Sequence, residues 1–165
     1  MNAIIRDASA ADLPAIRAIY NHYVRTCTCT YQIDEDTEAA RLAWWEGRGP
    51  SHPVLVAEEA GEVVAWGSLN SFNKREAFAL TVEDSLYVHH AAQGRGLGRA
   101  LLGALIERAR HSGVLTIIAA ISADQNGSIE LHRRMGFVET GRLLSVGRKF
   151  GKTLDLVYLQ LMPGA

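Results

Sequence analysis

Residues 93–99, QGRGLGR, place three glycines at alternate positions between an apolar segment and a long helical pattern. A helix start offers unpaired N–H groups and a partial positive charge, and both attract phosphate oxygens. Glycines let a ligand approach the main chain closely, while Arg95 and Arg99 add charge and hydrogen-bond donors. The stretch therefore predicts a pyrophosphate site. Its alternative is a tight strand-to-helix turn that binds nothing.

Two common nucleotide motifs fit this stretch poorly. A P-loop requires G-x-x-x-x-G-K-[ST], and no Lys-Ser or Lys-Thr pair follows these glycines. A dinucleotide fingerprint requires G-x-G-x-x-G, whereas Gly94, Gly96 and Gly98 give G-x-G-x-G.

Metal-ligand spacing is absent from the rest of the chain. Cys27 and Cys29 form C-x-C, and no second pair follows to complete a zinc site. On a strand His89 and His90 face opposite ways, which argues against a shared metal. The sequence therefore predicts no metal site, and reduced structural thiols at the two cysteines.

The overall composition is that of an ordinary globular protein. The chain has 165 residues, 48% of them hydrophobic, which suits one domain over residues 1–165. A formal net charge of -1 gives no field for nucleic acid or an anionic membrane. The first residues lack the features of a signal peptide, and no apolar run of about 18 residues exists to span a bilayer. We expect a cytoplasmic protein with neither nucleic acid nor membrane as a partner.

Hydrophobic periodicity predicts an α/β fold with helices on both sides of a mixed sheet. In the first helix, apolar residues from Leu13 to Tyr23 recur at spacings of three and four, with Tyr20 and Tyr23 among the predicted core. The remaining pattern predicts a hairpin over residues 52–72, helices over 37–48, 95–113 and 126–135, and strands over 3–9, 78–90, 114–122, 136–150 and 152–161.

Five segments of the chain carry a family resemblance. They are YNHYV (20–24), TVEDSLYV (81–88), QGRGLG (93–98), NGSIELHRRMGF (126–137) and VGRKFGKTLDLVYLQL (146–161). In this order they resemble the GNAT superfamily of acyl-CoA-dependent N-acyltransferases, and most closely its phosphinothricin and methionine sulfoximine N-acetyltransferase family. The resemblance implies a twisted, mostly antiparallel mixed sheet of about seven strands, acetyl-CoA as co-substrate, and a homodimer.

The resemblance also implies which residues bind acetyl-CoA. The pyrophosphate is expected on the main-chain N–H groups of the glycine stretch, and the pantetheine arm beside the strand that precedes it. The implied residues are Leu86, Tyr87, Val88, Gln93, Gly94, Arg95, Gly96, Leu97, Gly98, Arg99, Asn126 and Ser128.

Glu83 is the expected proton acceptor. An amine attacks a thioester only when it is neutral, and most amino acid amines are protonated at pH 7. Glu83 matches the glutamate that the family uses as general base. A regular strand would turn the neighbouring Asp84 toward the apolar face, so we expect a β-bulge there.

His132 takes the position where many members of the superfamily place a tyrosine that protonates the departing thiolate. Three roles stay open for it: catalytic acid, contact to the co-substrate, and packing.

The acceptor implied by the resemblance is a small amino-acid-like molecule. Phe72, Lys74 and Arg75 are expected to bind it, because a carboxylate calls for arginine or lysine, and Tyr31 is expected to form another wall. Arg75 matches the phosphinothricin branch. Asn73 replaces an arginine of the methionine sulfoximine branch, and Thr153 replaces a frequent tryptophan, so the narrower specificity stays open.

Direct attack of the amine is the expected mechanism, because Cys27 has no evident partner base nearby in the sequence. Acetylation of a protein N-terminus, a lysine or another small amine is a second hypothesis. A non-catalytic acyl-CoA sensor is a third, and the presence of Glu83 argues against it.

Overall fold

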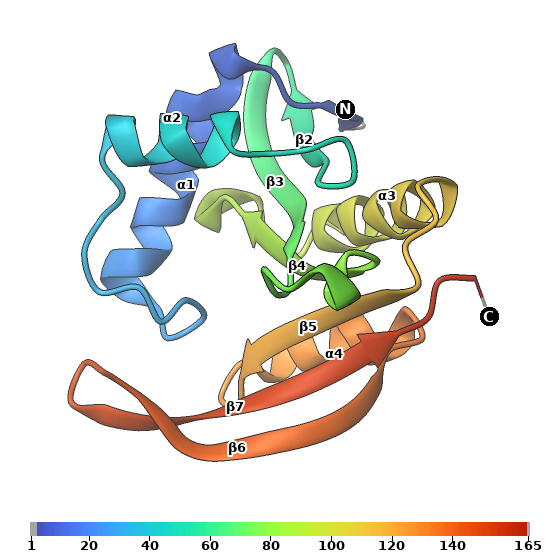
Figure 1. The fold of residues 1–165 in the computed structure, drawn as a ribbon. Helices are drawn as coiled ribbons and strands as arrows, with labels where there is room; N and C mark the ends of the chain where they lie inside the picture. Colours follow the sequence, from blue (N-terminus) through green and yellow to red (C-terminus); the bar gives the residue numbers. More distant parts are fainter. Residues whose placement is uncertain (1–2, 165) are drawn as a thin grey trace.

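A computed structural model describes residues 3–164, in which seven strands form one mixed sheet with helices on both faces (Figure 1). The strands are β1 (Ile4–Asp7), β2 (Val54–Glu59), β3 (Glu62–Ser71), β4 (Thr81–Val88), β5 (Thr116–Ser122), β6 (Val138–Lys149) and β7 (Lys152–Leu161). The helices are α1 (Leu13–Thr26), α2 (Glu38–Glu46), α3 (Leu97–His111) and α4 (Asn126–Arg134), with short 3₁₀ turns η1 (Ala10–Asp12), η2 (Glu76–Phe78) and η3 (His90–Ala92).

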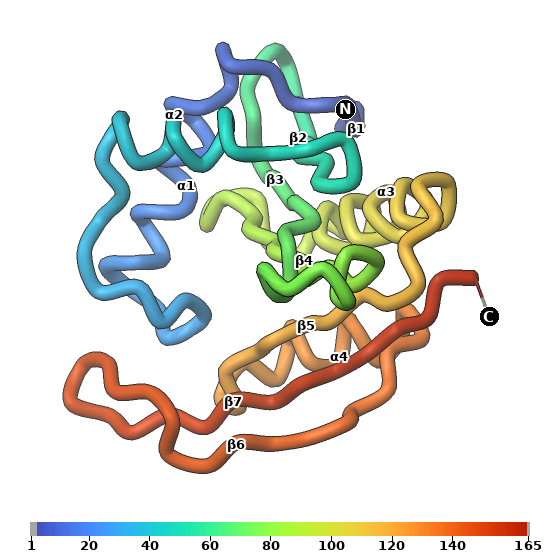
Figure 2. The backbone as a smooth tube through the Cα atoms, in the orientation of Figure 1, coloured from blue at the N-terminus to red at the C-terminus, as the bar shows by residue number. Residues whose placement is uncertain are grey.

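The strand order is β1-β2-β3-β4-β5-β7-β6, and every neighbouring pair is antiparallel except β4 and β5. The predicted fold is therefore confirmed: a mixed, mostly antiparallel sheet of seven strands. In Figure 2 the chain can be followed from the first four strands, through α3, to the half formed by β5, β6 and β7. None of the helices described in residues 3–164 is long and apolar enough to cross a membrane.

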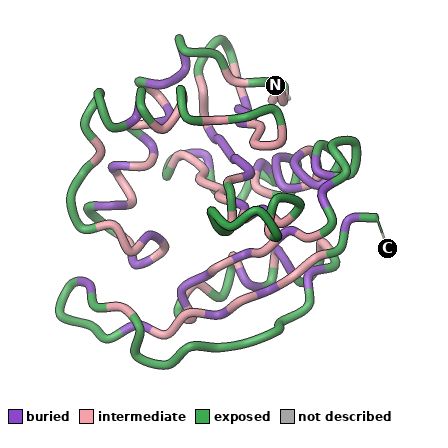
Figure 3. Tube along the Cα trace, viewed as in Figure 1, coloured by how far each residue is buried: buried purple, intermediate pink, exposed green. Residues whose placement is uncertain are grey.

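Buried side chains that alternate along the strands contribute to two hydrophobic cores. In β2, Leu55 and Ala57 join the large cluster that contains the apolar side of α3, whereas Val54 and Val56 join the cluster formed with α1. Successive strand residues face opposite sides of a sheet, so these two sets lie on its two faces. Figure 3 shows the buried segments along α3 and the central strands, while β6 is exposed along nearly its whole length.

The sheet opens between β4 and β5. The two strands pair only over the first part of β4, where Glu83 opposite Ile118 is the last pair. Beyond that point β4 stays paired with β3, while β5 pairs with β7. The N–H of His89 donates to the Val64 carbonyl of the β3 side at 2.8 Å. Because strand residues alternate in direction, the main-chain groups of Leu86 and Val88 face the opening instead.

The bulge predicted at Asp84 is wrong. β4 pairs with β3 in unbroken register, with Asp84 opposite Leu69 and Glu83 opposite Asn70. A regular strand does turn Asp84 into the buried face, but there its carboxylate lies 3.0 Å from a ring nitrogen of His132. Because His132 offers Asp84 a polar partner on the buried face, the strand needs no bulge to keep this carboxylate out of apolar surroundings.

Candidate active site

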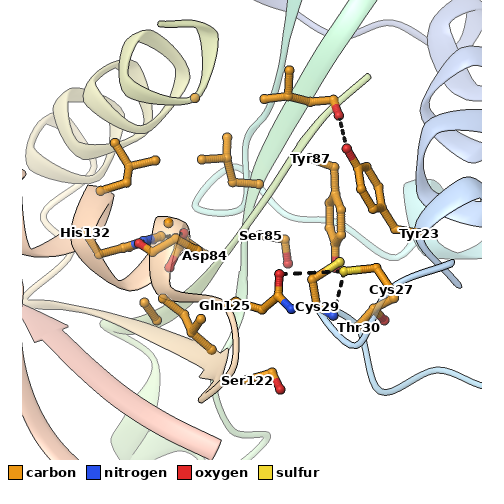
Figure 4. A pocket seen from close by; sticks show the side chains of 18 of the residues that line it. Tyr23, Cys27, Cys29, Thr30, Asp84, Ser85, Tyr87, Ser122, Gln125 and His132 are labelled. Atoms are coloured by element: carbon orange, nitrogen blue, oxygen red, sulfur yellow. Dashed lines mark hydrogen bonds and ion pairs between the residues drawn. The ribbon is translucent and has the colours of Figure 1, made fainter. Parts of the chain in front are cut away.

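A cavity of about 920 Å³ occupies the opening between β4 and β5 and extends between the C-terminal end of α1 and the N-terminal ends of α3 and α4 (Figure 4). A pocket of this volume has room for a large cofactor-like ligand. Many of the residues implicated by the sequence line it: Tyr31, Glu83, Leu86, Tyr87, Val88, Gln93, Gly94, Gly96, Leu97, Gly98, Arg99, Ser128 and His132.

Other implicated residues lie outside this lining. Arg95 pairs with Glu59 at 2.8 Å. Asn126 begins α4 and is exposed. The loop between β3 and β4 holds Phe72, whose ring packs against Phe78, and the exposed Lys74 and Arg75. None of these three side chains belongs to the lining of the cavity.

The glycine stretch forms the N-terminal end of α3. Gly94 and Gly96 have positive φ angles of 73° and 80°, which L side chains adopt rarely. The first helical hydrogen bond runs from the Ala100 N–H to the Gly96 carbonyl at 3.1 Å. Among the described residues, no acceptor meets the preceding N–H groups of Leu97, Gly98 and Arg99. These free donors, at the positive end of a helix and on the cavity wall, suit a phosphate group.

We expect Gly96→Val to raise the dissociation constant of acetyl-CoA about tenfold, because left-handed backbone at a β-branched residue costs about 1–2 kcal/mol and the loop must relax away from its binding form. Isothermal titration calorimetry measures this directly. Gly61→Val is the matched control, since Gly61 has a φ of 84° in the turn after β2 and, like Gly96, has no atoms within 4 Å of an added Cβ. Equal affinities of the two variants would contradict the role of Gly96.

Glu83 lies on the cavity wall at the point where β4 leaves β5. The side chain is half-buried, and burial, together with the nearby Asp84 carboxylate, raises the pKa of Glu83. The Asn70 amide donates to the Glu83 carbonyl at 3.2 Å and to the Ser85 hydroxyl at 3.1 Å, which holds this part of β4 in place. A carboxylate with a raised pKa is a stronger proton acceptor than an exposed one.

Asp84 and His132 form a buried pair that the sequence does not reveal. His132 Nδ1 lies 2.7 Å from the Ser128 carbonyl, which can only accept, so Nδ1 carries a proton. Nε2 lies 3.0 Å from Asp84 Oδ2. Burial works against a charged ring, but the hydrogen bond and negative charge of Asp84 outweigh it, and the pKa of His132 is raised. Both residues line the cavity.

Two tyrosines on the wall make polar contacts. Tyr23, which the sequence places in the core, donates its hydroxyl to the Val88 carbonyl at 2.5 Å and accepts from Gln93 Nε2 at 2.7 Å. It therefore ties the end of β4 to the glycine stretch. The Tyr31 hydroxyl donates to the Asp155 carbonyl at 2.8 Å, and its ring lies against Gly147, where a Cβ would be 2.6 Å away.

No three His, Cys, Asp or Glu side chains within residues 3–164 are arranged to hold a metal ion.

Comparisons with known proteins agree with this geometry. Residues 16–137 match the acetyltransferase (GNAT) family. An L-methionine sulfoximine/L-methionine sulfone acetyltransferase from Pseudomonas paraeruginosa is 46% identical over 163 residues, 98% of this chain and 95% of the relative. A phosphinothricin N-acetyltransferase from Alcaligenes faecalis is 38% identical over 95% of this chain and 79% of its own length.

A solved structure shows the same fold with the co-substrate. The yncA protein from Salmonella typhimurium with acetyl-CoA superposes with a TM-score of 0.95 at 42% identity, and the match covers 99% of this chain and 95% of that one. The family predicted from five sequence segments is thereby confirmed. The chain belongs to the acetyltransferase (GNAT) family.

Proposed function

We propose that this protein transfers the acetyl group of acetyl-CoA to the free amine of a small amino acid analogue by direct attack, with Glu83 as the general base. The position of Glu83 carries the proposal: a half-buried carboxylate with a raised pKa on the wall of the cavity where the two strands separate. Glu83 takes the proton of the attacking amine, directly or through one water molecule.

The main chain of this protein binds acetyl-CoA along the opening. Leu86 and Val88 offer main-chain groups to the pantetheine arm, and the N–H groups of Leu97, Gly98 and Arg99 bind the pyrophosphate. A free N–H near Val88 also donates to the oxyanion that forms on the thioester carbon.

His132 supplies the proton for the departing thiolate in this proposal. The proton on Nε2, which faces Asp84, is the one transferred, since Nδ1 stays bonded to the Ser128 carbonyl. Asp84 touches no reacting atom and acts as a positioning residue that holds the imidazole ring.

Relatives support the class of acceptor. Two relatives at 46% identity are named for L-methionine sulfoximine and L-methionine sulfone, and one at 38% for phosphinothricin; all three compounds carry an α-amino acid group. We propose an acceptor of this kind, and Arg75 as its carboxylate partner once the acceptor is bound. Acetylation of a protein N-terminus, a lysine or another small amine is the alternative.

An acceptor screen tests the proposed function. Purified protein and acetyl-CoA are incubated with amino acids and with their sulfoximine, sulfone and phosphinic analogues, and released thiol is measured. We expect thiol release that depends on the added amine, with at least one analogue giving a kcat/KM in the usual enzymatic range of about 10⁴ M⁻¹s⁻¹ or more. Release with a peptide N-terminus but with no amino acid analogue would favour the alternative. Saturable acetyl-CoA binding without transfer to any amine would indicate a sensor.

We propose further that the chain acts as a single domain and as a homodimer built on β6. This strand ends the sheet and pairs only with β7 among the described strands. It carries the exposed apolar side chains of Val138, Leu144 and Val146, with Phe150 in the turn that follows. Unpaired apolar edges are usually covered in soluble proteins. Sedimentation of the purified protein tests this: the mass of one chain at every concentration would contradict a dimer.

A further inference from the structure

Two thiols lie together on the cavity wall, just after α1. Cys27 is the residue that caps this helix, and the chain bends at residues 28–30, so that Cys29 returns to the same wall. Figure 4 shows the two sulfur atoms next to one another, and Cys27 Sγ also lies 3.7 Å from Gln125 Oε1. The Cys29 N–H also donates to Cys27 Sγ at 3.1 Å. Both side chains are partly accessible.

These contacts favour a thiolate at Cys27. The hydrogen bonds from Cys29 and the charge of Lys149 outweigh burial and the opposing charge of Asp124, and lower the pKa of Cys27 to about 6. The pKa of Cys29 is raised, because its proton is held by Cys27. Lys149 is itself buried and fixed, with Nζ donating to the Thr30 carbonyl at 2.8 Å. Cys27 is therefore the more acidic of the two thiols.

We propose that Cys27 and Cys29 form an oxidant-sensitive dithiol on the wall of the active site. The Cys27 thiolate attacks one oxygen of a hydroperoxide, the O–O bond breaks, and a sulfenic acid and hydroxide (or an alkoxide) are formed. The Cys29 sulfur then attacks the sulfenic sulfur, and water leaves as the disulfide forms. The two sulfur atoms together lose two electrons, and the peroxide gains them.

The chain geometry allows this bond. Cα atoms two residues apart are at most about 7 Å from each other, which is near the upper limit for a disulfide. The bend at Thr28 already brings the sulfur atoms together. The ring that a C-x-C disulfide closes is small, and a strained disulfide is easily reduced. The dithiol is therefore suited to reversible oxidation rather than to permanent cross-linking.

Oxidation of Cys27 and Cys29 would change the cavity wall next to the expected acceptor site. Thr28, between the two cysteines, donates its hydroxyl to Asp124 Oδ2 at 2.6 Å and accepts from Gln125 Nε2 at 3.0 Å. These two residues immediately precede α4, which carries His132. A disulfide across Thr28 displaces these contacts and removes the thiolate charge. The expected loss of transfer rests on the proposed function, whereas disulfide formation does not.

Thiol counting and intact mass after exposure to hydrogen peroxide at pH 7 test the chemistry. We expect both thiols of the folded protein to disappear together, the mass to fall by two hydrogen atoms, and dithiothreitol to restore both values. A thiol with a pKa near 6 is mostly thiolate at pH 7, whereas an ordinary cysteine is a few per cent thiolate, so oxidation should be about tenfold faster than in the urea-unfolded chain. Equal rates, or oxygen addition without a disulfide, would overturn the proposal.

Single variants separate the two sulfur atoms. In Cys29→Ser, Cys27 should stop at the sulfenic acid and be captured by dimedone, whereas Cys29 in Cys27→Ser should stay reduced. Circular dichroism checks that both variants fold. Where the screen finds an acceptor, oxidation of the wild type should lower kcat/KM for it about tenfold or more, reversibly, as expected for a displaced site wall. Cys27→Ser should keep its kcat/KM under peroxide, and an equal loss there would overturn the switch.

Discussion

Replacing Glu83 by glutamine is expected to lower kcat by about 10²–10⁴, the usual contribution of a general base, while acetyl-CoA affinity stays nearly unchanged. Glutamine keeps the shape of the side chain but cannot accept the amine proton. Glu83 also lies before the part of β4 whose main chain faces the opening, so the co-substrate contacts persist.

Thiol-release assays measure kcat, and calorimetry on the same preparation measures the affinity for acetyl-CoA. Glu76→Gln is the matched control, because Glu76 is an exposed carboxylate in η2 outside the cavity lining. Unchanged turnover in Glu83→Gln would remove Glu83 from the mechanism. A loss of turnover equal in both variants would point to a general effect of charge.

The pH profile gives an independent check on Glu83. Burial and Asp84 raise its pKa, so the carboxylate becomes protonated, and inactive as a base, at a higher pH than an exposed glutamate. The acidic limb of the kcat/KM profile should therefore lie above the ordinary glutamate value of about 4.3. This limb should be absent from the residual activity of Glu83→Gln.

The largest expected loss of stability follows from separating Asp84 and His132. His132→Leu leaves a carboxylate 9% exposed with no partner for either oxygen, since Oδ1 already has none within the described structure. Breaking a buried pair in this way costs about 3–5 kcal/mol. The free energy of unfolding from urea titration measures it. The double variant Asp84→Leu/His132→Leu buries no charge and should recover most of the loss.

The raised pKa of His132 determines how the stabilisation by the Asp84–His132 pair depends on pH. The stabilisation by this pair is fully present below the ordinary histidine pKa of about 6.5, and it is lost as pH rises through the folded-state value. Asp84→Asn keeps the shape, and its amide can donate to a neutral ring. The difference in unfolding free energy between wild type and Asp84→Asn should therefore shrink at alkaline pH. A constant difference would mean that His132 is neutral throughout.

The local spacing of hydrophobic residues was sufficient to predict the helices and strands of this fold. Alternation in β2 and the spacing of three and four in α1 report which face is buried, and both follow from the geometry of a strand and a helix. Gly96 marks the start of α3 because its positive φ excludes most other residues. The opening between β4 and β5 is different: no local pattern encodes it, and the family resemblance implied only that the pantetheine arm lies beside this part of β4.

Contacts between distant residues were beyond sequence reasoning. Asp84 and His132 are 48 positions apart, and neither the strand pattern around Asp84 nor the three roles left open for His132 indicated their contact. Cys27 likewise has no evident partner nearby in sequence, yet in the fold the positive charge of Lys149 acts on its thiol. In the opposite direction, Lys74 and Arg75 have the right chemistry for a carboxylate but lie outside the cavity, since side-chain type does not specify where a loop goes.

Hydrogen exchange of individual amides with and without acetyl-CoA tests most directly where the co-substrate binds. The account predicts strong protection on binding at Leu86 and Val88 on β4 and at Leu97, Gly98 and Arg99 at the start of α3, with little change along β6. Saturable binding that leaves those five amides exchanging at their free rates would contradict it.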